Sequence, residues 1–177
     1  MNKKLKLWEL NRKTEAEFRA QKKFPIVVVL DDIRSLNNIG SFFRTGDAFN
    51  IEKIFLCGIT AVPPHRDIHK TALGSTDTVD WEYNKQTLDC VRELKKKGCE
   101  ICVIEQTSET TFLQEVGQLE IKPLAIVFGN EVNGVAQEVI DVADRIIEIP
   151  QFGTKHSLNV SVCAGIVMWE FCKKHIQ

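Results

Sequence analysis

The chain has 177 residues and a net charge of −1, with 27% charged and 44% hydrophobic residues. A chain of this length fits a single domain and can bury about 70% of the surface of its unfolded form. No apolar run approaches the ~20 residues of a membrane-spanning helix, and the lysine-rich N-terminus has no apolar signal-peptide core, so we expect a cytoplasmic protein without a membrane partner.

The first 23 residues form a basic segment. Eight Lys or Arg residues stand there against Glu9, Glu15 and Glu17, so the segment carries +5 and the rest of the chain −6. Such a local positive charge favours an arm that faces RNA phosphates. The alternative is an exposed amphipathic helix whose charges face water. The sequence therefore divides into a basic arm, 1–23, and one domain, 24–177.

After the arm, apolar runs alternate with amphipathic segments. Alternation of this kind predicts an α/β fold with a mainly parallel sheet flanked by helices. The longest stretch without either pattern, Gly58–Gly74, is predicted to be an irregular exposed loop and a candidate for substrate contact. The predicted strands are Ile26–Leu30, Lys53–Cys57, Thr78–Tyr83, Glu100–Ile104, Leu124–Phe128 and Arg145–Ile149, and the predicted helices are Ile39–Phe49, Gln86–Lys97, Val135–Val142 and Leu158–Lys173.

The six cysteines include one C-x-x-C pair, Cys99 and Cys102. Residues three apart on a strand point to opposite faces, so this pair cannot chelate one ion. We therefore predict free, buried thiols in a reducing compartment and no metal site.

A polar motif follows the first predicted strand. Asn38 directly precedes the predicted helix Ile39–Phe49, and Gly40 and Arg44 lie within it on a different face from its apolar stripe. We expect Arg44 to point away from the core, with Gly40 leaving room beside it one turn earlier.

A second motif follows the apolar strand Leu124–Phe128. Gly129, Asn130, Glu131 and Gly134 form a glycine-bounded polar loop. Loops at this end of a parallel strand are where open α/β sheets bind ligands.

A third motif opens the last predicted helix, Leu158–Lys173, which is apolar almost all round and is therefore predicted to be buried on nearly every face. Ser157 and Asn159 would add polar groups to the unpaired N–H groups of that helix start. Equally, Ser157 can simply cap the helix.

Together the three motifs resemble the SpoU branch, also called TrmH-like, of the SPOUT superfamily of knotted RNA methyltransferases. The resemblance runs from about Pro25 to Lys174. It implies an α/β knot with a C-terminal trefoil knot, where topology rules alone would predict an ordinary doubly wound sheet. It further implies bound S-adenosylmethionine and a homodimer packed through the knot region.

The resemblance also assigns roles to residues. It places Gly129, Asn130, Glu105, Ile149 and Leu158 at the cofactor, although the last two suit a plain core as well.

By the same analogy Arg44 acts on the target ribose 2′-OH and a neighbouring phosphate. A guanidinium stays protonated, so electrostatic stabilisation is the alternative to a general base. Asn38 would cap its helix or orient Arg44, and Ser157 and Asn159 would hold the nucleotide. Glu131 would cap the helix from Val135, or it would hold Arg44 within one chain or across the dimer.

The function predicted on this basis is RNA ribose 2′-O-methylation, with tRNA favoured over rRNA because only a short basic arm precedes the domain, and with no DNA partner. A catalytically inactive RNA-binding protein of the same fold is the alternative, but it should have lost Arg44 or the Ser157 and Asn159 pair. An unrelated nucleotide-binding enzyme would need a glycine-rich phosphate loop, which the sequence lacks.

Asn50 stands where a glycine is frequent in the family and should tolerate left-handed backbone. Asn133, where a basic or small residue is frequent, bears on substrate choice.

Overall fold

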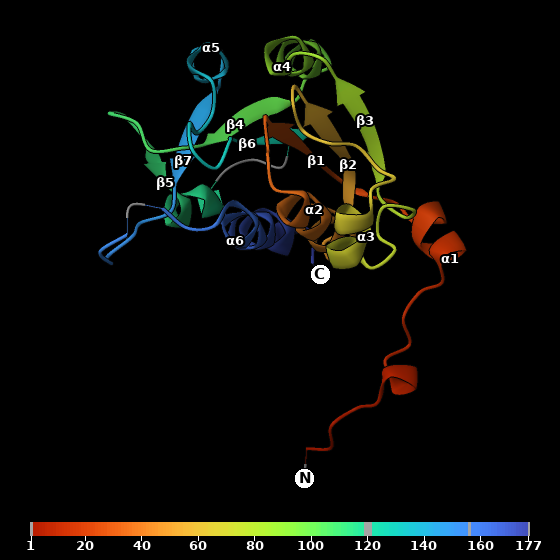
Figure 1. Ribbon diagram of the computed structural model, residues 1–177. Coiled ribbons are helices and arrows are strands. Elements are labelled where there is room, and N and C mark those ends of the chain that lie inside the picture. The colour runs from red at the N-terminus through yellow and green to blue at the C-terminus, as the bar shows by residue number, and fades with distance from the viewer. Residues whose placement is uncertain (1, 119–121, 156, 177) are drawn as a thin grey trace.

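The computed structural model describes residues 2–118, 122–155 and 157–176. Across these residues seven strands form one sheet in the order β3-β2-β1-β6-β4-β7-β5, and the neighbouring strands pair in parallel (Figure 1). The predicted α/β fold with a mainly parallel sheet is thus confirmed. The strands are β1 (Phe24–Asp31), β2 (Ile51–Cys57), β3 (Asp80–Asn84), β4 (Glu100–Ile104), β5 (Thr111–Phe112), β6 (Leu124–Phe128) and β7 (Arg145–Glu148).

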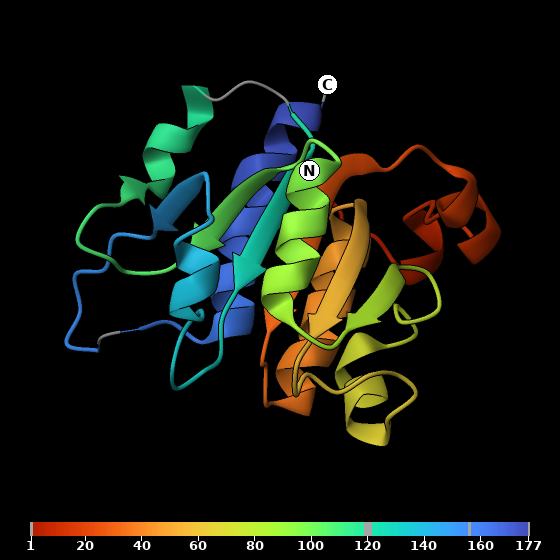
Figure 2. The same ribbon diagram turned by 90° about the horizontal axis from the view of Figure 1, so that it is seen from above.

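Helices cover both faces of the sheet. Helices α2, α3 and α6 lie on one face and α4 and α5 on the other, whereas α1 belongs to the N-terminal arm (Figures 1 and 2). None of these helices is long and apolar enough to cross a membrane. Their bounds are α1 (Glu15–Ala20), α2 (Leu36–Ala48), α3 (Arg66–Ala72), α4 (Thr87–Lys96), α5 (Gln137–Ile140) and α6 (Val160–Cys172), with 3₁₀ turns at Leu7–Glu9, Leu113–Gln118 and Lys173–His175.

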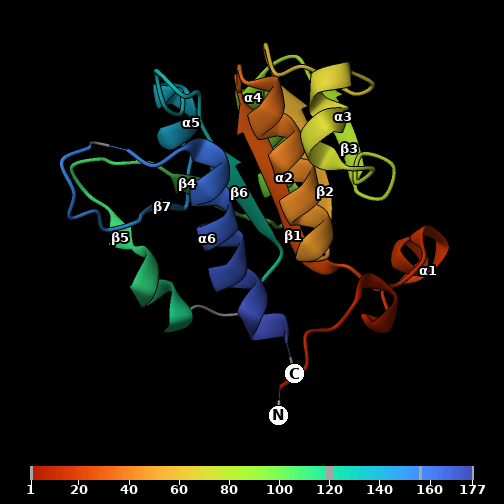
Figure 3. The same ribbon diagram turned by 60° about the horizontal axis from the view of Figure 1, so that its bottom comes forward.

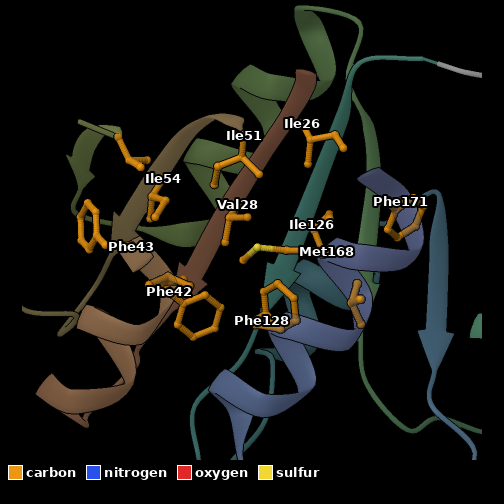
Figure 4. Packing of buried hydrophobic residues seen from close by; sticks show 14 of the residues in the cluster. Ile26, Val28, Phe42, Phe43, Ile51, Ile54, Ile126, Phe128, Met168 and Phe171 are labelled. Atoms are coloured by element: carbon orange, nitrogen blue, oxygen red, sulfur yellow. The ribbon is translucent and has the colours of Figure 1, made fainter. Parts of the chain in front are cut away.

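Strand alternation divides the core into two layers. Val28 and Leu30 of β1 face α2 and α6, whereas Val27 and Val29 face α4 and α5. In the larger layer Phe42 of α2 meets Phe128 of β6 edge to face, with ring centroids 5.2 Å apart, and Met168 of α6 fills the space beside them (Figure 4). Helices α2 and α6 therefore lie side by side on the sheet (Figure 3).

The cysteines are free as predicted, but Cys99 and Cys163 are only partly buried. All six are free, and the C-x-x-C pair divides between the layers, because Cys102 packs into the larger layer and Cys99 against the smaller one. Burial raises the pKa of the Cys102 thiol to about 12, so it stays protonated at neutral pH.

The strand order departs from a simple doubly wound sheet, because β6 inserts between β1 and β4. The chain passes through β4 to the edge strand β5, returns to the centre at β6, and then adds β7 between β4 and β5. This rearrangement is consistent with a knotted C-terminal part, and the trefoil knot itself stays a prediction.

Two predicted elements were wrong. The segment Gly58–Gly74 contains the helix α3, whose short apolar side consists of Ile68 and Ala72. The helix predicted at Val135–Val142 is a single turn, Gln137–Ile140.

Helix α6 is not buried on nearly every face as predicted. One side, which includes Val167 and Met168, packs into the core. On the other side Val162, Ile166 and Trp169 are 54%, 41% and 51% exposed. These three residues follow helical spacing, so they form one continuous apolar stripe on the surface.

We expected Gly40 to leave room for the Arg44 side chain, but α3 occupies the space beside Gly40. A Cβ atom at Gly40 would lie 2.3 Å from the carbonyl oxygen of Ile68 and 3.0 Å from the amide nitrogen of Ala72. The missing side chain therefore lets α3 pack directly on α2.

We predict that Gly40→Ala lowers the free energy of unfolding by about 1–3 kcal/mol, because α3 must move away from the new methyl group. Urea unfolding followed by circular dichroism measures this change. Gly153→Ala is the matched control, since its Cβ would meet nothing within 4 Å, and it should stay within about 0.5 kcal/mol of wild type. Equal effects of the two substitutions would contradict the packing role of Gly40.

Candidate active site

The three sequence motifs are joined by a chain of hydrogen bonds at one end of the sheet. The Glu131 carboxylate accepts from the Asn38 side-chain amide at 3.0 Å, and the Asn38 carbonyl oxygen accepts from the Asn159 amide at 3.2 Å. These contacts bring together residues 93 and 121 positions apart in the sequence.

Glu131 caps the start of α2. Its two carboxylate oxygens accept the backbone N–H groups of Arg34 and Ser35, each at 3.0 Å. The two roles expected for it, a cap on the helix after Val135 and a contact to Arg44 within the chain, are therefore wrong. Burial opposes ionisation of Glu131, but the hydrogen bonds from Arg34, Asn38 and Ser35 outweigh it and hold its pKa below the ordinary value.

The helix starts differ from those predicted in the first and third motifs. The N-cap of α2 is Ser35, so Asn38 lies within the first turn and neither caps the helix nor contacts Arg44. The N-cap of α6 is Asn159, whose side-chain oxygen accepts from the backbone of Ser161 at 2.9 Å. The capping role considered for Ser157 is therefore wrong.

The glycine-bounded loop after β6 folds back tightly on itself. Asn130 and Gly134 pair backbone to backbone at 2.9 and 3.0 Å. A Cβ at Gly129 would lie 2.2 Å from the backbone of Gly134 and Val135, so no other residue fits there.

The Asn130 side chain is fully used in fixing this loop. Its amide donates to the Asp32 carbonyl at 2.7 Å, and its oxygen accepts from Val132 and Asn133. Asn130 can therefore contribute backbone and shape to a ligand site, but its side-chain amide is already committed.

A cavity of about 390 Å³ opens between the second and third motifs. This volume lies within the range of small-molecule sites. Apolar side chains and backbone form much of its wall, and carboxylate, amide and hydroxyl groups stand among them, a mixture that suits a nucleoside-like ligand. The residues predicted for the site that line the cavity are Glu105, Gly129, Asn130, Glu131, Ile149, Ser157, Leu158 and Asn159.

Several further lining residues escaped the sequence reasoning, among them two glutamines and a cysteine. Gln106, Gln151 and Cys163 also line the cavity. Burial, with a smaller effect of the Glu105 charge, raises the pKa of the Cys163 thiol to about 12, so this thiol is no nucleophile at neutral pH. Gln106 is the second residue after the end of β4, and the rule that strand ends carry ligand residues could have found it.

Arg44 lies apart from the cavity. It is exposed on α2 six residues after Asn38, which is about 9 Å along the helix axis. Its guanidinium has no hydrogen-bond or ion-pair partner in the described chain and lines a different hollow, between α2 and the N-terminal arm. A single chain thus does not bring Arg44 together with Ser157 and Asn159.

The comparisons with known proteins agree with this arrangement. Residues 25–169 match the model of the SpoU rRNA Methylase family. The chain belongs to this family. It is 33% identical over 152 residues to the 23S rRNA (guanosine-2′-O-)-methyltransferase RlmB of Nitrosomonas europaea, with 86% of the chain and 57% of that protein covered. The chain thus spans little more than half the length of this relative.

Two solved structures share the fold. The TrmH/SpoU tRNA modifying enzyme of A. aeolicus superposes with a TM-score of 0.80 at 27% identity, over 91% of this chain and 80% of that one. The AdoMet-bound rRNA methyltransferase of Sinorhizobium meliloti gives 0.78 at 24% identity, over 96% and 63%. In this family member, Glu131 and Asn38 join the three motifs that define the resemblance.

We predict that Glu131→Gln lowers the free energy of unfolding at neutral pH by about 1 kcal/mol, a value reduced because the carboxylate is partly solvated. The folded-state pKa of Glu131 is depressed, so its contribution is present above the ordinary pKa of a glutamate and is lost as pH falls through the folded-state value. Urea unfolding at a series of pH values measures the difference between variant and wild type, which should shrink in acid.

Glu138→Gln is the matched control, because Glu138 is exposed and makes no hydrogen bond in the described part of the chain. It should leave both stability and its pH dependence unchanged. A difference between Glu131→Gln and wild type that persists unchanged in acid would contradict the capping role.

Proposed function

We propose that the chain transfers a methyl group from S-adenosylmethionine to a ribose 2′-OH of RNA. The observation that carries the proposal is the cavity, because the second and third motifs line it and Asn38 of the first motif is tied to its wall. The relative from N. europaea is named for the same reaction. Gly129, Ile149 and Leu158 would hold the cofactor, chiefly through backbone groups and apolar contact, with Glu105 beside them.

Methyl transfer from a sulfonium to an oxygen requires that the reacting atoms be held in line, and it does not require a metal ion. S-adenosylmethionine would supply the methyl group from its sulfonium: the O–CH₃ bond would form as the S–CH₃ bond breaks, the sulfonium would become a neutral thioether, and the 2′-OH proton would pass to solvent water. Ser157 and Asn159 stand at the cavity wall, where they would orient the nucleotide. The wall groups also exclude water from the reacting atoms.

Arg44 would stabilise the charge that develops on the ribose oxygen. Its guanidinium is always protonated, so it acts by binding a phosphate with its two-pronged fork and by facing the alkoxide, not by removing the proton. Its lack of a partner within the described residues leaves this fork available.

A homodimer is part of the proposal. The stripe Val162, Ile166 and Trp169 exposes three large apolar side chains on one helix face, which a second copy would cover. A partner packed here would also bring its own site residues close to α2, where Arg44 lies.

We favour tRNA as the substrate. In superposition the tRNA modifying enzyme of A. aeolicus is matched over 80% of its length, whereas the rRNA methyltransferase of Sinorhizobium meliloti is matched over 63%. Mapping ribose methylation across tRNA and rRNA, from cells with and without this protein, tests the choice. A lost methyl group in rRNA alone would refute the tRNA assignment.

We predict that Arg44→Ala lowers methyl transfer by at least ~100-fold and leaves cofactor binding nearly unchanged, because Arg44 does not line the cavity. Arg44→Lys should restore little, since an ammonium cannot form the bidentate fork. A tritiated-methyl assay and calorimetry with the cofactor measure the two properties.

The matched control is Arg92→Ala, an exposed arginine of α4 on the opposite face of the sheet. It should retain full activity. Activity of Arg44→Ala within a few-fold of wild type would favour the alternative in which this fold only binds RNA.

We predict that Ile166→Glu converts the homodimer to a monomer, because it places a charge in the centre of the exposed stripe. Equilibrium sedimentation at micromolar concentration measures the mass. Ile59→Glu changes another exposed isoleucine in the same way and should leave the dimer intact. A wild-type monomer that still methylates RNA would refute the dimer and any site shared between subunits.

A further inference from the structure

A groove of about 980 Å³ separates the N-terminal arm from the domain. Arg12 and Lys13 line it from the arm, and Arg44 lines it from the opposite wall on α2. It is distinct from the cavity of the candidate active site, with which it shares no lining residue.

The cations of the groove suit an anionic ligand. Arg12 and Arg44 have no hydrogen-bond or ion-pair partner in the described ranges of the chain, and Lys13 donates only to the neutral side chain of Gln21. Glu15 and Asp47 also line the groove, and Asp47 accepts a hydrogen bond from the Thr78 hydroxyl at 2.6 Å. Free guanidinium forks on facing walls are the arrangement that binds phosphates of one strand from both sides.

Apolar side chains form the rest of the groove. The rings of Phe18, Phe24 and Phe49 line it, and Leu73, at the end of α3, is 66% exposed. Cationic walls around aromatic and apolar surface are typical of sites for single-stranded nucleic acid, where phosphates pair with Lys or Arg and bases stack.

The arm is fastened to the domain instead of trailing from it. The Asn50 side chain accepts from the Gln21 amide at 2.7 Å and donates to the Lys22 carbonyl at 2.9 Å. Arg19 adds a hydrogen bond to the carbonyl of Asp77. These contacts fix α1 and hold the residues just before it, Arg12 and Lys13, at the groove.

Asn50 has a backbone that does not require an asparagine. Its φ is +54°, in the left-handed region, where glycine is equally suitable. The amide side chain is therefore needed for the arm and not for the turn. A glycine at position 50 would keep the turn and remove both hydrogen bonds of the Asn50 side chain to the arm, leaving the one from Arg19 to Asp77.

We propose that this groove binds a single-stranded segment of the RNA substrate, with Arg12 and Lys13 on the arm and Arg44 on α2 holding its phosphates, and that Asn50 positions the arm for this contact. The inference rests on the proposed function and identifies the surface that holds the substrate. A loose basic tail would bind RNA through all eight cations of the arm, whereas this proposal assigns binding to two of them, Arg12 and Lys13.

The first test compares Arg12→Gln/Lys13→Gln with Lys3→Gln/Lys4→Gln, which removes the same charge from the arm outside the groove. Binding of fluorescein-labelled oligouridylate and of unfractionated tRNA is measured over a range of salt concentrations. The groove variant should flatten the log–log salt slope by about 1.4, the value for two single-strand phosphate contacts, and the control should change it little. Equal effects of the two variants would overturn the groove.

The second test uses Asn50→Gly, with Asn11→Gly as the matched control at another left-handed asparagine, one that makes no side-chain hydrogen bond in the described structure. Asn50→Gly should weaken oligouridylate binding about five-fold, because the arm must be ordered at the moment of binding, and should preserve the salt slope. Methylation should show a raised KM with kcat retained. Unchanged affinity of Asn50→Gly would overturn its positioning role.

Two outcomes distinguish a failure of this inference from a failure of the proposed function on which it rests. If wild-type protein binds RNA through Arg12 and Lys13 but transfers no methyl group to any RNA, the proposed function fails and the groove stands. If wild type methylates RNA and the groove variant instead loses its dimer in sedimentation with RNA binding intact, a second copy occupies the groove and this inference fails.

Discussion

The site depends above all on one carboxylate at a helix N-terminus. Glu131 accepts two backbone N–H groups from the start of α2 and the Asn38 amide, so its negative charge meets the positive end of the helix. This fixes the loop after β6 against the loop after β1, and the Asn38–Asn159 bond extends the connection to α6. The cavity lies between the parts that these bonds hold together, so its shape follows from a few hydrogen bonds among distant segments.

The strands and their polar ends could be predicted, because a buried parallel strand reads as a short continuous apolar run and its following loop lies at the ligand edge. The partner of Glu131 could not, since nothing local in the sequence indicates a cap supplied from almost a hundred residues away. Helix α3 was missed for a different reason. Its seven residues bury only Ile68 and Ala72, which is too short a pattern to distinguish from a polar loop.

Helix α6 shows the limit of periodicity most clearly. A helix that is apolar all round indicates that every face is covered, but it does not say by what. Here the fold covers the side of Met168 and leaves Ile166 and Trp169 exposed. The same pattern in the sequence therefore encodes packing within the chain on one side and, on our proposal, packing between chains on the other.

The separation of Arg44 from the cavity gives that second packing a functional reason. Six helical residues turn Arg44 about 120° away from Asn38 and move it ~9 Å along the axis, and Arg44 lines the groove and not the cavity. The groove beside Arg44 and the cavity beside Asn159 have no lining residue in common, and on our proposal they are two half-sites on one chain. A substrate held by Arg44 meets a cofactor only if another cavity stands next to the groove, and a second copy packed on the α6 stripe is the simplest source of one. On our proposal the dimer would therefore serve the chemistry as well as cover apolar surface.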